Sequence, residues 1–472
     1  MRKVFTAAAL LVLIPGLAPF SRALEFSFAG VSYKSAPAAV SAPDMVNAKS
    51  AAPKVKEWTV MVFLNGKNNL ELAGLYNVNK MEKVGSDANI NVVVELGRMN
   101  GQAAGDTNMD GNWTGSRRLY IKKDKNDMAV TSPIVQKAPV VDMGDYKRVV
   151  SFVKWAKESY PARKYMLVLW DHGSGWMDLA PKPKTAQKGI SFDDETGNFI
   201  RTRQIGDILK EAGRVDVLAY DACLMQMAEV AFEVKDNASV IVGSEETVPG
   251  TGYPYDLILG VLAQKPALSA EDMGILTVEA YKAFYEAMKK GTQLSAIRAA
   301  KLGDLGTKMA EFSALAREVN DAAALKAARA GVIRYDMLGE ELDPKMSISF
   351  YGDLHQYAGL MAAGLKSNDG KAAALRQKAA ALQQFIDKEL VIDNKATGNN
   401  RLGRPLAESR GLSVYLPPAE TRVAQEKLEG LFEGKYGEFL FDKEVHWHDY
   451  VTYLYGVKLQ RPPLKCPAYP AR

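Results

Sequence analysis

The chain has 472 residues, of which 47% are hydrophobic and 24% are charged, and its net charge at pH 7 is +5. This composition is that of an ordinary globular protein with ample material for a core, and the length predicts roughly two to three domains. The small net charge and the lack of a basic stripe with interleaved aromatic residues argue against a nucleic-acid partner.

The first 23 residues have the pattern of a secretory signal peptide. A basic start at residues 1–3 precedes an apolar run at 4–14, and small residues flank Arg22 at the positions that a signal peptidase reads. We therefore expect cleavage before Leu24, export to the periplasm or out of the cell, and no membrane partner afterwards. An uncleaved membrane anchor is the less favoured alternative, because the apolar run is shorter than the ~20 residues that span a bilayer.

Residues 24–56 are rich in Ala, Ser and Pro, which is typical of a linker or a pro-segment. Beyond them, short apolar runs alternate with helical patterns. The runs predict strands at 58–64, 89–96, 118–122, 164–170, 215–220 and 238–243, and the helical patterns lie at 68–84, 145–160, 201–212 and 224–234. This alternation predicts an α/β domain at 57–264, with a mostly parallel sheet covered by helices on both faces.

From about residue 265 the pattern becomes helical and rich in Ala. It predicts a mostly helical C-terminal region over 265–472. One strand-like run, "RGLSVYLPP" at 410–418, interrupts the helical pattern, and we expect it to add a strand.

Two of the predicted strands end in residues that carry chemistry. The strand at 164–170 is followed by "DHGSGW", which contains His172, and the strand at 215–220 is followed by "DACLM", which contains Cys223. Functional residues of parallel sheets lie just past the carboxyl ends of strands, so these two side chains are expected to lie close together. A thiol nucleophile and an imidazole that moves its proton form the pair that a cysteine peptidase needs.

More ordinary roles are open for both residues. A cysteine at a strand end is often a small buried hydrophobic residue, and a histidine in a loop is often only a polar one. The second cysteine, Cys466, lies in a Pro-rich tail, so a disulfide between it and Cys223 is disfavoured. A metal site formed by His446 and His448 is weakly indicated, because no further ligand is evident.

The residues around Cys223 predict how its thiolate and an oxyanion would be stabilised. Leu224, Met227, Ala228 and Ala231 share one helical face, which predicts a helix that begins at or just after the cysteine and places the thiolate at the positive end of the helix dipole. Gly173 has no side chain to obstruct a substrate carbonyl. Its N–H and that of Cys223 are therefore the predicted oxyanion hole.

Five segments, "WTVMVFLNGKNNLE", "LVLWDHGSGW", "DVLAYDACLMQMAEVA", "GSEETVPGTGYPY" and "RGLSVYLPP", resemble the clostripain-like cysteine peptidases, relatives of caspases and gingipains. The resemblance spans residues 58–418. It implies a caspase-like αβα sandwich, a His172–Cys223 dyad, cleavage after basic residues and activation by self-cleavage. The resemblance also raises calcium dependence, although no cofactor is required for the chemistry itself.

Asp221 is the predicted specificity residue. It lies two positions before Cys223 at the end of an extended strand, so the two side chains leave on the same side. A carboxylate beside the nucleophile suits a cationic substrate side chain, and a guanidinium engages it with two hydrogen bonds. Protein or peptide substrates with Arg, or Lys, before the cleaved bond are therefore expected. The alternative role for Asp221 is a helix cap. A second wall of the pocket is predicted from Glu245, Glu246 and Asp256.

Two loops carry weaker signals. Asp106, Asn108 and Asp110 alternate as in the opening of a calcium loop, but Arg117 occupies the position of the closing Glu, and a polar turn is the alternative. The segment 177–198 is a poor helix and a poor strand, so we expect an exposed loop where proteolysis concentrates. Its candidate self-cleavage sites follow Lys182, Lys184 and Lys188, and a plain surface loop is the alternative.

Two other functions stay open on the sequence alone. A caspase-like binding module without catalysis would keep the fold, but the intact His172 and Cys223 argue against it. A different cysteine hydrolase or a transpeptidase would use the same pair of residues.

Overall fold

The computed structural model describes residues 24–35, 54–101, 107–108, 110–176, 189–335, 350–400, 402–417 and 436–454. Its centre is a nine-stranded sheet with the order β15-β12-β11-β10-β7-β3-β4-β5-β6. The parallel core consists of β11 (Ala238–Gly243), β10 (Val215–Asp221), β7 (Ala162–Trp170), β3 (Lys56–Gly66) and β4 (Ile90–Arg98). Antiparallel pairs extend it on both sides: β12 (Thr292–Arg298) with β15 (Val391–Thr397), and β5 (Gly115–Tyr120) with β6 (Ile134–Ala138).

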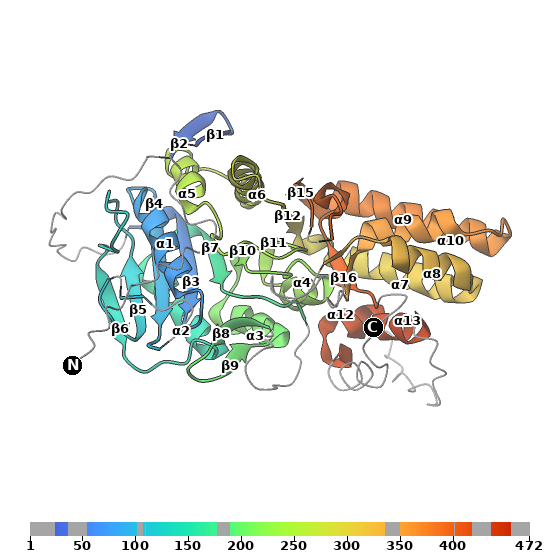
Figure 1. Cartoon of the computed structure of the whole chain (residues 1–472), viewed down its shortest axis with the longest axis horizontal. Coiled ribbons are helices and arrows are strands. Elements are labelled where there is room, and N and C mark those ends of the chain that lie inside the picture. The colour runs from blue at the N-terminus through green and yellow to red at the C-terminus, as the bar shows by residue number, and fades with distance from the viewer. Residues whose placement is uncertain are drawn as a thin grey trace, which may run out of the picture.

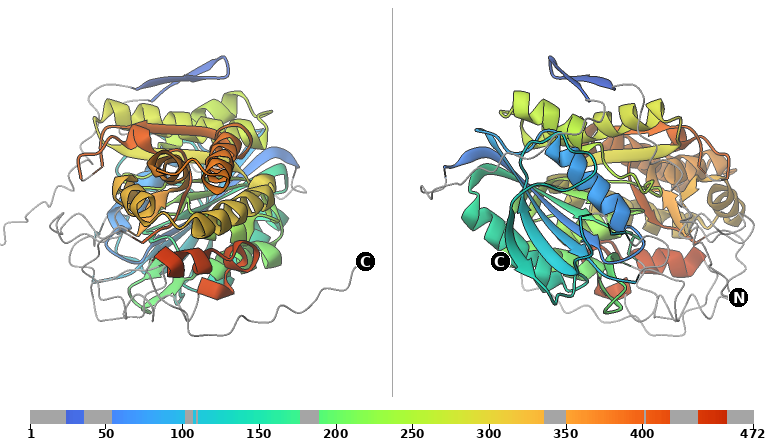
Figure 2. Two further views of the ribbon diagram at one scale, coloured as in Figure 1. Left: turned by 90° about the vertical axis from the view of Figure 1, so that its right-hand side faces the viewer. Right: turned by 60° about the vertical axis from the view of Figure 1, so that its left-hand side comes forward.

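Helices cover both faces of this sheet (Figure 1, Figure 2). One face packs on α1 (Glu71–Glu82), α5 (Tyr255–Gln264) and α6 (Ala270–Ala287), and the other on α2 (Tyr146–Ser159), α3 (Thr202–Ala212) and α4 (Ala228–Val234). Both faces need cover because apolar side chains alternate between them along β3. Met61 and Phe63 join the core on the α2 side, whereas Val60 and Val62 join the core on the α1 side. The predicted αβα sandwich with a mostly parallel sheet is confirmed.

The C-terminal region is mostly helical, as predicted. Its helices are α7 (Leu302–Val319), α8 (Ala322–Gly331), α9 (Leu354–Gly364), α10 (Gly370–Phe385), α12 (Leu440–Val445) and α13 (Trp447–Leu454). The first four lie side by side at the end of the molecule opposite β6 (Figure 1). None of the helices in the described ranges is both long and apolar enough to cross a membrane.

The strands of the C-terminal region are distributed differently from the sequence-based expectation. The run at 410–418 supplies β16 (Ser413–Tyr415), but β16 pairs with β14 (Tyr351–Asp353), which also pairs with β13 (Arg334–Tyr335), in a small separate sheet. The strands that extend the main sheet are β12 and β15. The main sheet therefore takes strands from beyond residue 264, and the two predicted regions are interleaved.

The start of the described chain is a hairpin rather than a linker. β1 (Glu25–Phe28) and β2 (Val31–Lys34) pair and lie against α5. A Cβ on Gly260 of α5 would come within 2.2 Å of the Tyr33 ring, so the glycine makes room for the hairpin. The predicted signal peptide and residues 36–53 lie outside the described residues.

Candidate active site

His172 and Cys223 leave the sheet side by side. β7 and β10 are neighbours and run in parallel, with Trp170 opposite Asp221, and each candidate follows its paired residue by two positions. The loops that carry them touch, because a Cβ on Gly173 would lie 2.4 Å from the Cys223 carbonyl oxygen and 3.1 Å from its nitrogen. The structure thus brings together the two residues that the sequence predicts as a dyad.

The imidazole and the thiol each make a hydrogen bond to another group. His172 Nε2 lies 2.6 Å from Asn69 Oδ1, which can only accept, so Nε2 carries the proton and Nδ1 is the basic nitrogen. Cys223 Sγ accepts from the Val248 N–H at 3.2 Å. Asn69 therefore orients the imidazole, as the third member of a nucleophile–base arrangement does.

Burial favours the neutral form of both members of the pair. It lowers the pKa of His172 to about 4. Burial, together with the charges of Glu246 and Asp221, raises the pKa of Cys223 to about 11, as predicted for a carboxylate beside the thiol. These shifts favour a neutral thiol–imidazole pair over an ion pair.

The backbone around Gly173 suits an oxyanion hole. Its N–H interacts with the Cys223 thiol and favours the thiolate. Gly173 also forms an isolated antiparallel bridge with Ile190, which fixes its backbone. A Cβ on Gly173 would lie 3.1 Å from the Cys223 nitrogen, so the two backbone segments that supply the predicted oxyanion donors are close to one another.

The predicted helix start at Cys223 is wrong. α4 begins at Ala228, and Leu224 has a φ of +62°, which no helix residue adopts. The backbone between them pairs with other segments: Gln226 N–H donates to Ser244 O at 3.0 Å, and Gln226 O accepts from Ser413 N–H at 3.1 Å. Consequently no helix dipole acts directly on the thiol.

A dense hydrogen-bond network supports the His172 side of the site. Asp171 accepts hydrogen bonds from Asn68 Nδ2 at 2.7 Å, from Asn65 Nδ2 at 3.3 Å and from the Phe192 N–H. Both asparagines also donate to the Phe192 carbonyl. This network joins the end of β3 to the hairpin of β8 (Ile190–Asp193) and β9 (Asn198–Ile200).

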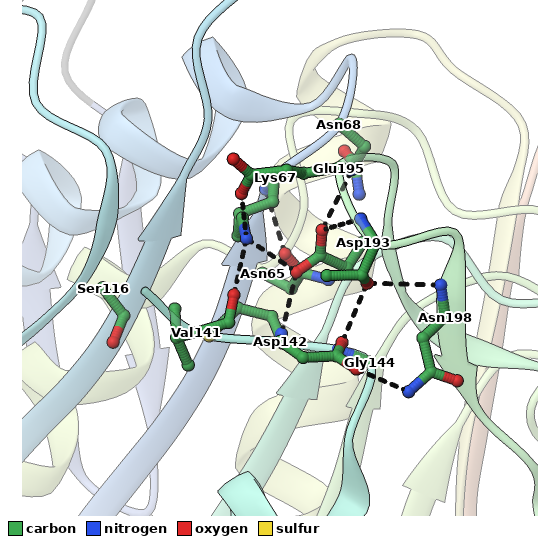
Figure 3. Close-up of polar contacts among 12 residues, drawn as sticks. Asn65, Lys67, Asn68, Ser116, Val141, Asp142, Gly144, Asp193, Glu195 and Asn198 are labelled. Atoms are coloured by element: carbon green, nitrogen blue, oxygen red, sulfur yellow. Dashed lines mark hydrogen bonds and ion pairs between the residues drawn. The ribbon is translucent and has the colours of Figure 1, made fainter. Parts of the chain in front are cut away.

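Lys67 extends this network as a fully buried cation (Figure 3). Its Nζ lies 2.9 Å from Asp193 Oδ2 and 2.5 Å from Glu195 Oε2, and it donates to the Val141 carbonyl at 2.6 Å. Lys67 and the two asparagines of this network come from the "NGKNN" segment at 65–69, which supplies none of the predicted site residues. The signal was present, because this polar run directly follows the predicted strand at 58–64, where functional residues of such sheets lie.

Asp221 is buried beside Tyr253 and Tyr255, which belong to the core on the α1 side of the sheet, and 3% of its surface is exposed. Its Oδ2 accepts from the Tyr253 N–H and the Tyr255 hydroxyl, both at 2.9 Å, and its Oδ1 has no hydrogen-bond partner within the described ranges. Burial raises the pKa of Asp221 to about 7, and the charge of Lys80 acts against this shift. Asp221 does not cap α4, because that helix has Met227 at its N-cap.

The other predicted carboxylates divide between two places. Glu246 acts electrostatically on Cys223, and Asp256, in the first turn of α5, acts on Lys80. Glu245 points elsewhere: its Oε2 accepts from the Gly411 N–H at 2.8 Å, and its carboxyl group contacts Asp353 of the C-terminal region. Its contacts are those of a link to that region and not those of a pocket wall.

The candidate calcium and self-cleavage residues are largely outside the described residues. Asp106, Lys182, Lys184 and Lys188 lie there. Asn108 O accepts from the Gly111 N–H, and Asp110 Oδ1 accepts from the Val130 N–H at 2.8 Å, with Arg98 and Arg117 acting on its charge. Across the described ranges, no three His, Cys, Asp or Glu side chains are grouped as metal ligands would be.

With this geometry established, comparisons with known proteins decide the family. The sequence model of the clostripain family matches residues 62–454. The chain belongs to this family of cysteine peptidases. It is 27% identical over 249 residues to clostripain of Hathewaya histolytica, a match that covers 48% of this chain and 46% of clostripain. The chain thus spans about half the length of this curated relative.

Solved structures show the same fold. A secreted C11 cysteine protease from Bacteroides thetaiotaomicron, in complex with an irreversible peptide inhibitor, superimposes with a TM-score of 0.60 at 20% identity and covers 83% of this chain and 99% of that one. An inactive zymogen C11 protease from Parabacteroides distasonis superimposes with a TM-score of 0.58 at 20% identity and covers 84% of this chain and 99% of that one.

Proposed function

We propose that the chain is an exported cysteine endopeptidase that cleaves peptide bonds after Arg, or Lys, with Cys223 as nucleophile and His172 as base. The observation that carries this proposal is the parallel register of β7 and β10, which delivers both residues to one sheet edge beside a buried carboxylate. Membership in the clostripain family supports the reaction class.

The neutral pair predicts general-base chemistry. His172 Nδ1 accepts the Cys223 thiol proton as the sulfur attacks the substrate carbonyl carbon. The N–H groups of Gly173 and Cys223 stabilise the oxyanion that forms, and the imidazolium then returns the proton to the leaving amine. Water hydrolyses the resulting thioester with the same base. In the resting structure the thiol donates to the Val248 carbonyl oxygen at 3.7 Å and accepts from the Val248 N–H, so the S–H must turn away from Val248 to reach the imidazole.

Recognition of a basic side chain is assigned to Asp221. Its Oδ2 is held by two donors, which leaves Oδ1 as an unpaired acceptor in a buried setting. A buried unpaired acceptor is costly, and an ammonium or guanidinium group would satisfy it. A guanidinium would contact both oxygens if Tyr255 gave up its hydrogen bond to Oδ2, and that exchange would favour Arg over Lys.

The decisive experiment measures kcat/KM on matched peptides with Arg, Lys or Gln before the cleaved bond. Asp221→Asn should lower kcat/KM for the basic peptides about 100-fold or more and change the Gln peptide little, because specificity is a ratio of these constants. Asp216→Asn is the control, because Asp216 lies on the same strand and accepts only from the Tyr165 N–H at its other end. An equal loss on all three peptides would contradict the assignment.

Labelling with a peptidyl-Lys electrophile tests the nucleophile independently. Mass spectrometry should find the adduct on Cys223, and Cys466→Ala should label like the wild type. An adduct on Cys466, or labelling of Cys223→Ala, would overturn the reaction assignment.

Self-activation by cleavage after Lys182, Lys184 or Lys188 is part of the proposal. The resemblance to a family with a zymogen structure supports it. Purified Cys223→Ala protein should stay one chain while the wild type becomes two, and N-terminal sequencing should place the cut within 177–198. Calcium binding by the loop with Asp106, Asn108 and Asp110 is a separate proposal, and identical titration traces for wild type and Asp110→Ala would reject it.

A further inference from the structure

Lys80 is a buried lysine of α1 whose charge acts on the candidate specificity residue Asp221. It lies in the last turn of α1 with 4% of its surface exposed, and its Nζ has no hydrogen-bond partner in the part of the chain that the structure describes. The ammonium stacks over the rings of Phe284 and Tyr76, at 4.1 Å and 4.7 Å from their centroids. Burying a charge without hydrogen bonds is unfavourable, so its position requires compensation by other groups.

Two carboxylates supply that compensation. Burial lowers the pKa of Lys80 to about 8, and the charges of Asp256 and Asp221 act against this shift. The effect is mutual, because the charge of Lys80 lowers the pKa of Asp221. Lys80 is therefore electrostatically coupled to the residue that is proposed to bind the substrate side chain.

Unpartnered polar atoms gather around this pair. Asn77 Oδ1, Asp221 Oδ1 and the Tyr281 hydroxyl are buried and, like Lys80 Nζ, have no partner among the described residues. The Asn77 amide, through its Nδ2, and both Asp221 oxygens lie within 3.2 Å of the position that a Cβ on Gly252 would take, and Tyr281 interacts electrostatically with Asp221. Buried polar atoms are normally paired, so such a group indicates a place built for water or a ligand.

We propose that Lys80 is a specificity-determining residue, a resident cation that keeps the Asp221 carboxylate charged in the empty pocket and so commits the pocket to a basic substrate side chain. This inference rests on the proposed function, because it assumes that Asp221 binds that side chain. Lys80 acts through Asp221 and is a positioning residue rather than a catalytic one.

The other groups that face Asp221 cannot replace this cation. α5 supplies Tyr255 and Asp256, α6 supplies Tyr281 and Tyr285, and the adjoining loops supply Tyr253 and Cys223. Burial raises the pKa of each phenol and of the thiol, so these groups are neutral near pH 7, and Asp256 is an acid. The hydrogen bonds from Tyr253 and Tyr255 also favour the carboxylate, and Lys80 adds a positive charge to them. Loss of that charge raises the pKa of Asp221, and a protonated carboxyl has no charge to offer a Lys or Arg side chain.

The test is the pH dependence of kcat/KM for matched Lys, Arg and Gln peptides, measured from pH 5.5 to 9.5. For the basic peptides, kcat/KM falls as the pH is lowered, and in Lys80→Met this fall (the acid limb of the profile) should begin at a higher pH. Each pH unit by which the limb moves should lower kcat/KM at pH 6.5 about tenfold. At pH 9 the two enzymes should agree within about twofold, and the Gln peptide should show no new limb. Lys80→Arg keeps the charge and should keep the wild-type limb.

A second readout avoids catalysis. Benzamidine, a small cation, should inhibit the wild type at pH 6.5, and its inhibition constant should rise about tenfold in Lys80→Met while staying unchanged at pH 9. Lys80→Gln gives the same comparison if the Met variant does not fold.

The outcomes separate the two proposals. If the uncharged variants lower all three peptides equally with an unmoved acid limb, Lys80 only packs the core, and the inference is wrong. If the wild type does not distinguish basic from Gln peptides and Asp221→Asn changes nothing, the proposed specificity itself fails. If the acid limb of the pH profile shifts in Lys80→Met but not in Lys80→Arg, the result supports both the proposed specificity and the role of Lys80.

Discussion

The two flanks of the candidate dyad are built in opposite ways. On the His172 side, the ammonium of Lys67, the amides of Asn65 and Asn68 and the carboxylate of Asp171 all have hydrogen-bond or ion-pair partners. On the Asp221 side, polar atoms of Asn77, Lys80, Asp221 and Tyr281 are buried and have no hydrogen-bond partner among the residues that the structure describes.

The difference indicates what each flank is for. A fully paired buried network is rigid, which suits a base whose ring must keep one orientation. An incompletely paired one is unfavourable until something completes it, which suits a pocket that awaits a charged ligand. The first flank should therefore control stability, and the second should control substrate choice.

Removing the dyad should have the largest effect, because its two residues join the flanks. His172→Ala and Cys223→Ala should each lower kcat/KM about 10⁴-fold or more with unchanged circular dichroism, and the double variant should lose no more than the worse single variant. Multiplicative losses in the double variant would mean that the two residues act separately.

Gly173→Ala should have the second largest effect, a loss of about 100-fold in kcat. A Cβ would meet the Cys223 carbonyl oxygen at 2.4 Å, so the loops must separate, and the oxyanion donors with them. Steady-state kinetics should show the loss in kcat more than in KM. Gly250→Ala, where a Cβ meets nothing within 4 Å, is the control and should stay near wild type.

Lys67→Met tests the stability half of the comparison. It leaves the buried Asp193 carboxylate without its cation, so the free energy of unfolding should fall by about 3 kcal/mol, with little change in the preference for basic peptides. Urea unfolding measures this loss. Lys147→Met, which removes an exposed pair with Glu211, should cost less than about 1 kcal/mol. Equal losses of unfolding free energy in the two variants would mean that the paired network on the His172 side contributes no special stability.

A buried acid pair outside both flanks should give the smallest effect, a slope of stability with pH. Burial and the nearby Asp353 raise the pKa of Glu245, so the folded protein holds a proton that the unfolded chain has lost above its ordinary pKa. Stability should therefore fall as pH rises from about 5, by up to ~1.4 kcal/mol per unit, until the folded-state pKa is passed. Glu245→Gln should flatten this slope in pH-dependent denaturation; an unchanged slope would contradict it.

The sheet core and the dyad could be predicted because they follow from local pattern. Continuous apolar runs such as the one at 164–170 occur in strands that are buried on both faces, and parallel strands bring their carboxyl ends together. β12 and β15 could not be located from the sequence because they lack such a local pattern. Their sequences, "TQLSAIR" and "VIDNKAT", mix polar and apolar residues, and their place in the sheet depends on distant partners.

The start of α4 shows where local pattern fails. The spacing of Leu224, Met227 and Ala228 fits a helix, yet the backbone of Gln226 finds better partners in Ser244 and Ser413, from segments 18 and 187 residues away. Such tertiary hydrogen bonds have no local signature. Lys80 was invisible for a related reason, because on an amphipathic helix a lysine is expected to face solvent.

The pairing of Gly173 and Ser174 with Gly189 and Ile190 bears on how the protein would refold. The Ser174 N–H donates to Gly189 O at 3.0 Å, and Gly189 N–H donates to the Ser174 hydroxyl at 2.6 Å, so the two ends of segment 177–188 are held together. A cut within this segment would leave those contacts intact while making two chains of one. Reassembly after unfolding would then depend on concentration, and the lifetime of the cut enzyme would be set by its unfolding rate rather than by an equilibrium.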